Sequence, residues 1–222
     1  MRTEILPLQT ISSPESSPKA AFNRRSLMRA ALGLSLGLPL ALTGCQTPEP
    51  ERLVLPEISF AHRPVLTFAA GSVDTITEFK PSFQDPHIEH LLPQPPARVA
   101  ERWVRDRVRL DNSQPNSLRV VIKDASVIEQ DIAKTPGLRG NFTTDQVARF
   151  EVSVEMAVEL RDARGFKVGE AAASAKRANT LSEKATLNDR DRLIHDLIRL
   201  AINDLDAELE KSIRSYMPLY VQ

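Results

Sequence analysis

The sequence has 222 residues, and its 29 Lys and Arg residues balance its 29 Asp and Glu residues, so the formal net charge is zero. This balance argues against a general nucleic-acid-binding protein, which needs a basic excess to neutralise phosphates. The content of 41% hydrophobic and 26% charged residues is typical of a globular chain, and the single cysteine excludes both an internal disulfide and a metal site with two thiolate ligands.

The first 44 residues predict a cleaved export signal. Residues 1–29 hold five basic and two acidic residues, and residues 30–43 form an uncharged run rich in Ala, Leu and Gly. As a helix this run extends ~21 Å, which is short of the ~30 Å hydrocarbon core and fits a signal peptide better than a membrane span. The signal carries 5 − 2 = +3, so the mature chain, residues 45–222, carries 0 − 3 = −3.

The apolar run ends in Leu42-Thr43-Gly44-Cys45, which resembles the lipobox of bacterial lipoproteins. The resemblance implies that the Cys45 thiol receives a diacylglyceryl group and anchors the mature chain to a membrane. The alternative is a free, buried cysteine after an unrelated apolar run. Gln46 stands where an Asp acts as an inner-membrane retention signal in some lineages, so we expect an outer-membrane lipoprotein that faces the periplasm.

The export route has two interpretations. Arg24-Arg25-Ser26-Leu27-Met28-Arg29 resembles the twin-arginine signal, and the modest hydrophobicity of residues 30–43 suits that route. The alternative is a general-secretion signal whose basic segment contains Arg24 and Arg25 by chance.

The mature chain divides into a tether and one domain. Prolines at four positions in residues 46–64 predict an extended tether over residues 45–64, followed by a single domain over residues 65–222. Residues 65–79 form a weak strand region. Residues 81–96 hold five prolines and predict a loop.

A helix is expected from Pro95-Pro96 to about Leu110, with apolar residues on one side. A stripe of basic residues covers the other side: Arg98, Arg102, Arg105 and Arg109. The stripe is a candidate contact for anionic lipid or a partner protein, and a solvated helix face is the alternative.

Three strands should follow this helix. Apolar residues recur at every second position over residues 118–123, and this strand continues to residue 128. Residues 150–160 alternate over eleven positions, which predicts one buried and one solvated face. Asp162-Ala163-Arg164-Gly165 predicts a hairpin turn to a partner strand over residues 166–177. In the loop between the first two of these strands, Leu138 and Phe142 are candidate partner contacts or a local apolar staple.

A long helix is expected from about Asn188 to Tyr216, with its N-cap near Asn188. The order β-α-β-β-β-α then predicts an α+β fold: a small antiparallel or mixed four-stranded sheet with two helices on one face.

The sequence contains no phosphate-binding glycine loop, nucleophile elbow or dinucleotide fingerprint, and we expect no cofactor. His87, Glu89 and His90 are the one compact group of metal-type ligands, although histidines in a loop are more often solvated. Glu151, Glu155 and Glu159 share a strand face at the spacing of an acid-base pair, but the solvated face of an amphipathic strand is the stronger interpretation.

The lipobox and the element order together resemble small envelope lipoproteins of Gram-negative bacteria, including ABC-transport auxiliary and lipopolysaccharide-assembly lipoproteins and uncharacterised proteobacterial lipoproteins. The resemblance implies a non-enzymatic accessory or binding component of the cell envelope, which meets the membrane through acylated Cys45 and has an envelope protein or anionic lipid as its partner. No nucleic acid is expected. The alternative is a periplasmic metal-dependent or hydrolytic enzyme that uses His87, Glu89 and His90.

Overall fold

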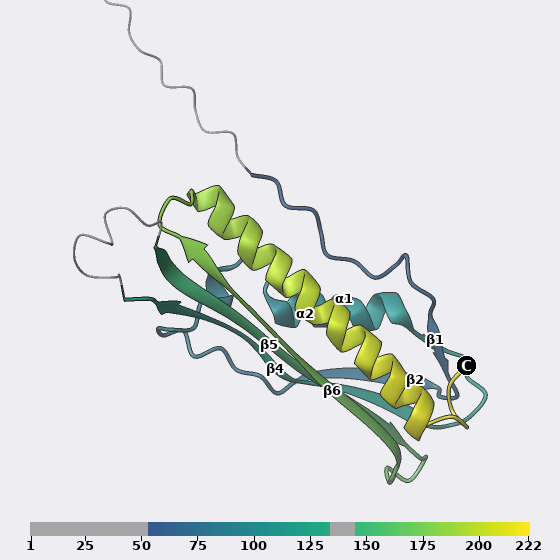
Figure 1. Cartoon of the computed structure of the whole chain (residues 1–222). Helices are drawn as coiled ribbons and strands as arrows, with labels where there is room; N and C mark the ends of the chain where they lie inside the picture. The colour runs from purple at the N-terminus through teal and green to yellow at the C-terminus, as the bar shows by residue number, and fades with distance from the viewer. Residues whose placement is uncertain (1–52, 134–144) are drawn as a thin grey trace, which may run out of the picture. The chain divides into compact units, whose positions relative to one another are not determined.

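The computed structural model describes residues 53–133 and 145–222. The predictions for the export signal, for Arg24, Arg25 and Cys45, and for Leu138 and Phe142 lie outside these ranges. Within them the chain forms an α+β domain with a mixed sheet and two helices on one face of that sheet (Figure 1). The predicted fold class is therefore confirmed.

The main sheet has the order β2-β4-β5-β6, formed by Ser72–Thr77, Ser117–Asp131, Gln146–Arg161 and Lys167–Ser182. β2 pairs with β4 in parallel, and the other two pairings are antiparallel. The β5–β6 connection includes Gly165, whose φ of 87° is the left-handed conformation that a tight turn requires and that glycine adopts without strain.

One face of the sheet builds the core. The alternating residues of β5 that were predicted to face inward are at most 1% exposed: Phe150, Val152, Val154, Met156, Val158 and Leu160. A bulge in β4 between Ile122 and Asp124 shifts the register, so that Ala125 and Val127 also face the core. The predicted period of two is therefore confirmed in β5, the bulge interrupts it in β4, and both strands extend beyond their expected ends.

The two helices cover this apolar face. α1 spans Pro96–Arg107 and buries Val99, Ala100, Trp103 and Val104. α2 spans Leu187–Tyr216 and packs along β5 and β6 (Figure 1). Its N-cap is Thr186 rather than a residue near Asn188: Thr186 accepts a hydrogen bond from the Asp189 N–H, and the Asp189 carboxylate accepts one from the Thr186 N–H.

The first helix ends earlier than predicted. Val108–Leu110 forms strand β3, which pairs in parallel with β1, Leu66–Phe68. The chain end adds a further bridge, because Thr67 and Gln222 exchange two backbone hydrogen bonds. Pairing with β1 therefore overrides the helical periodicity at Val108, and Arg109 belongs to a strand.

The predicted tether is also too long. Ile58 and Phe60 are 5% and 1% exposed and belong to the core cluster of the domain. The domain therefore begins upstream of residue 65, because a segment expected to be extended and solvated supplies apolar side chains to the core. A short 3-10 helix, η1, spans Glu89–Leu91 within the proline-rich loop.

Among the described residues, no helix combines the length and apolarity that a membrane crossing requires.

Candidate functional site

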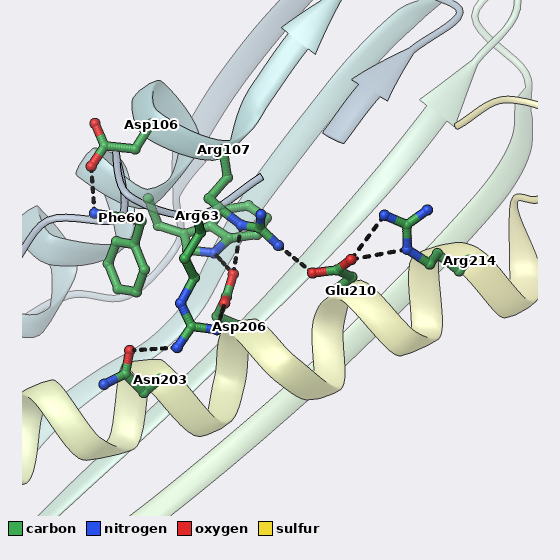
Figure 2. Close-up of polar contacts among 9 residues, drawn as sticks. Phe60, Arg63, Asp106, Arg107, Asn203, Asp206, Glu210 and Arg214 are labelled. Carbon is green, nitrogen blue, oxygen red and sulfur yellow. Dashed lines mark hydrogen bonds and ion pairs between the residues drawn. The ribbon is translucent and has the colours of Figure 1, made fainter. Parts of the chain in front are cut away.

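The most extensive buried polar cluster joins the two helices to the segment that precedes β1 (Figure 2). The Asp206 side chain on α2 is fully buried, and three donors converge on its carboxylate. Trp103 Nε1 donates to Oδ1 at 2.5 Å, Arg107 Nε donates to Oδ1 at 2.9 Å, and Arg63 Nη1 donates to Oδ2 at 2.7 Å. Both oxygens therefore have hydrogen-bond donors, which compensate the carboxylate for the hydration that it loses on burial.

Glu210, one helical turn further along α2, extends the cluster. It binds the Arg107 guanidinium on one side and Arg214 at 2.9 Å on the other (Figure 2). Burial raises the pKa of Glu210, but hydrogen bonds from Arg214 and Arg107 outweigh it and hold the pKa below the ordinary value of 4.5. The Arg107–Asp206–Glu210 cluster connects α1 to α2, because Arg107 on α1 forms ion pairs with both carboxylates on α2. Each of these charged groups therefore has an opposite charge beside it.

We call residues 53–63 the strap, because polar contacts fasten this segment across both helices. Gln94 Oε1 accepts from the Ile58 N–H at 3.0 Å, and the Arg102 guanidinium donates to the Ile58 carbonyl at 2.8 Å. The Asp106 carboxylate accepts from the Phe60 N–H at 2.7 Å. His195 Nε2 lies 2.9 Å from the Pro56 carbonyl oxygen on the α2 side. The strap is thus anchored at several separate points.

The structure breaks up the predicted arginine stripe. Arg98 and Arg105 are exposed on α1, and Arg109 is exposed on β3. Arg102 is largely buried beneath the strap, where it also pairs with Glu57. The helix therefore does not present four arginines as one surface, because one of them is used internally.

The second predicted group consists of His87, Glu89 and His90, and its carboxylate, Glu89, is buried. Glu89 is 1% exposed; its Oε2 accepts from the Val127 N–H at 3.2 Å and lies 3.6 Å from His87 Nδ1. No three His, Cys, Asp or Glu side chains within residues 53–133 and 145–222 are placed to hold a metal ion. The three-ligand centre that the enzyme alternative requires is therefore not assembled by these residues.

The carboxylates on the outer face of β5 form ion pairs. Lys176 lies 2.5 Å from Glu151, Lys123 lies 3.8 Å from Glu155, and Arg161 lies 2.6 Å from Glu159. A hydrogen bond from Lys176 lowers the pKa of Glu151, and one from Arg161 lowers the pKa of Glu159. A general acid needs the opposite shift, so the geometry fits the solvated strand face that the sequence favoured.

Sequence reasoning missed Arg107 and Asp206. Both occupy positions on the apolar side of their helices: Arg107 lies four residues after Trp103, and Asp206 lies four residues after Ile202. A charged residue in each of two apolar stripes was the available signal for a buried ion pair.

Comparisons with known proteins add structural neighbours. No protein-family model and no curated protein sequence matches this chain. A minor lipoprotein from Acinetobacter baumannii is 16% identical, with 67% of this chain and 94% of that chain covered and a TM-score of 0.36. The rare lipoprotein B from Shewanella oneidensis is 13% identical, with coverage of 65% and 96% and a TM-score of 0.35. These neighbours are bacterial lipoproteins, but TM-scores below 0.5 do not establish a common fold or function.

Proposed function

We propose that this protein is a bacterial lipoprotein, anchored through an acylated Cys45, that acts as a non-enzymatic accessory or binding component of the cell envelope. The observation that carries the proposal is the sequence Leu42-Thr43-Gly44-Cys45 at the end of an apolar run of signal-peptide length. We further propose that the domain faces the periplasm from the outer membrane, on the basis of Gln46.

The strap supports an anchored role for the domain. Eleven peptide units connect Cys45 to Pro56, the first strap residue with a described polar contact, so a fully extended connection reaches at most ~40 Å. A tether that continued to residue 64, as the composition predicted, would reach at most ~68 Å. A short connection and a fastened strap restrict where the domain can operate, which suits a component that meets a ligand or partner at the membrane surface.

Anionic lipid is the partner favoured by the exposed arginines. Arg98, Arg105 and Arg109 remain free of the strap, and each basic residue near an anionic membrane contributes ~1 kcal/mol at low salt. This attraction should weaken with salt, because exposed charges are screened within ~8 Å at physiological ionic strength. An envelope protein is the alternative partner for the same surface.

Membrane fractionation tests the anchoring. Wild-type protein expressed with its own signal should remain in the membrane pellet after a high-salt wash, since acyl chains and not charges hold it. Cys45→Ser should move to the soluble fraction. Cys45→Ser that stays in the washed pellet as fully as wild type would overturn the anchoring proposal.

Flotation with anionic vesicles tests the lipid contact separately. The unacylated Cys45→Ser chain should float with vesicles rich in phosphatidylglycerol at low salt, and Arg98→Ala/Arg105→Ala/Arg109→Ala should reduce flotation without changing folding. If the parent protein ignores these vesicles at low salt, the three arginines form only a solvated surface and the protein partner remains.

A further inference from the structure

β6 forms one edge of the main sheet, and the side of β6 that faces away from β5 is free. Within residues 53–133 and 145–222, no backbone hydrogen bond joins residues 168–178 to a segment other than β5. Every second residue of such a strand directs its N–H and C=O groups away from the sheet, where they are available to another strand. At ~3.4 Å per residue this free edge is about 37 Å long.

The free edge lacks the features that commonly protect an edge strand from pairing, namely proline, a bulge or a covering loop. β6 contains no proline, and its pairing with β5 is regular from Gly169 to Leu181. Small side chains occupy its centre, Ala171-Ala172-Ala173-Ser174-Ala175, and they do not shield the backbone. The opposite edge of the sheet differs: β2 has only six residues, and the proline-rich loop continues along β4 through the bridge between His87 and Ile128.

The outer face of β6 carries one exposed charge of each sign, Glu170 and Lys176. A two-fold axis perpendicular to the sheet relates two copies of β6 as antiparallel strands. An axis at Ala173 places Glu170 opposite Lys176 of the second copy, and it does so twice, because the axis repeats every contact. The two strands are therefore complementary in charge when they pair about Ala173.

Other two-fold registers lack this complementarity. An axis at Ala172 or at Ser174 leaves Glu170 opposite an uncharged residue of the second copy. An axis at Glu170 or at Lys176 places like charges directly opposite one another, which is destabilising. Charge alone therefore selects a single register for the pairing of β6 with itself.

The pairing about Ala173 also retains the ion pairs within each chain. Lys176 lies 2.5 Å from Glu151, and Glu170 lies 2.7 Å from Lys167. Across the joint between two copies these pairs would form a line of alternating sign: Glu151 and Lys176 of one copy, followed by Glu170 and Lys167 of the second. The contact therefore leaves none of these charges without an opposite charge beside it.

We propose that β6 pairs with β6 of a second copy of this chain, antiparallel and centred on Ala173, so that two four-stranded sheets form one continuous sheet. Backbone hydrogen bonds supply the attraction, and the Glu170–Lys176 pairs fix the register. This inference goes beyond the anchored role, which a single copy fulfils.

Disulfide cross-linking in whole cells tests the proposal on the chain expressed with its own signal. In this register residue 173 faces itself, and the Cα atoms of directly opposite residues are ~4.5 or ~5.5 Å apart, within the range of a disulfide. Ala173→Cys should therefore form a covalent dimer under mild oxidation. Ala178→Cys is the matched control on the same edge, because the two copies of residue 178 are ~34 Å apart along the strands and should not cross-link.

Charge reversal in the Ala173→Cys chain tests the register. Glu170→Lys or Lys176→Glu places like charges opposite one another and should lower the cross-linked fraction several-fold. The double reversal restores opposite charges across the joint and should recover the cross-linked fraction. Contacts within one chain cannot explain this recovery, because the double reversal leaves like charges beside both Lys167 and Glu151.

Co-purification of two differently tagged wild-type copies gives a measurement that does not depend on the fold of Ala173→Cys, and the tagged copies should be recovered together. Equal cross-linking of Ala173→Cys and Ala178→Cys, a double reversal that stays as low as the single reversals, or no co-purification overturns the proposal. The unsubstituted chain, whose one cysteine is Cys45, tests the anchored role in the same experiment. A covalent dimer of that chain would reveal a free Cys45 thiol and contradict acylation, so the two proposals fail by different results.

Discussion

Replacing Asp206 by asparagine tests whether the Arg107–Asp206–Glu210 cluster stabilises the contact between the two helices. The substitution keeps the shape of the side chain but removes a charge that faces the fully buried Arg107 and accepts from Trp103 and Arg63. Breaking one partner of a buried ion pair costs ~3–5 kcal/mol, because the other charge is left uncompensated. Arg107 retains Glu210 as a partner, so we expect a loss of about 3 kcal/mol in the free energy of unfolding.

Urea unfolding followed by circular dichroism measures this loss, and the thermal midpoint should fall by ~6–12 °C for a domain of this size. Asp204→Asn is the matched control on the same helix. Asp204 pairs with Arg177 at 2.5 Å, but both side chains are more than a third exposed, so its loss should cost less than ~1 kcal/mol. Equal, small effects of the two substitutions would refute the structural role of the buried cluster. The double substitution Arg107→Met/Asp206→Leu should be less destabilising than Asp206→Asn, since it buries no unpaired charge.

Three further predictions concern the core, a helix cap and acid stability. Val154→Asp should abolish cooperative unfolding because Val154 is 1% exposed and offers no partner for a charge, whereas Ser153→Asp on the other strand face should be mild; equal damage would mean that both faces are packed. Thr186→Ala should lower stability by ~1 kcal/mol through loss of the α2 capping box, and an unchanged urea midpoint would contradict this. The pKa values of Glu151, Glu159 and Glu210 are lowered in the folded state, so their stabilisation is complete above the unfolded value of about 4.5 and is lost as pH falls through the folded values. The urea midpoint should therefore change little between pH 7 and pH 5 and drop below pH 4.5, and the triple Gln variant should drop less steeply.

Periodicity explains which parts of the fold were predictable. The alternation over residues 150–160 and the apolar stripe of the last helix each repeat several times, so local pattern and tertiary packing agree there. The end of α1 was not predictable in the same way, because Val108–Leu110 continues a helical pattern but pairs with β1, some forty residues away in sequence. Long-range pairing of this kind leaves no local signal.

The candidate sites were less accessible to sequence reasoning. The composition of residues 53–63 gave no sign that Ile58 and Phe60 enter the core, because burial there depends on a surface built by two distant helices. His87, Glu89 and His90 were recognisable as polar residues of interest, but Glu89 is buried where its carboxylate accepts from the Val127 N–H of β4, a long-range contact without a local signal. The Arg102 contact with the strap likewise required the three-dimensional structure.

The central claim is that Cys45 is the acylated N-terminus of the mature protein. Mass spectrometry of the mature protein, purified from membranes after expression with its own signal, tests it most directly. The account predicts that the N-terminal peptide begins at Cys45 and carries a diacylglyceryl modification. A chain that retains residues 1–44, or a mature N-terminus at another residue with an unmodified Cys45, would contradict it.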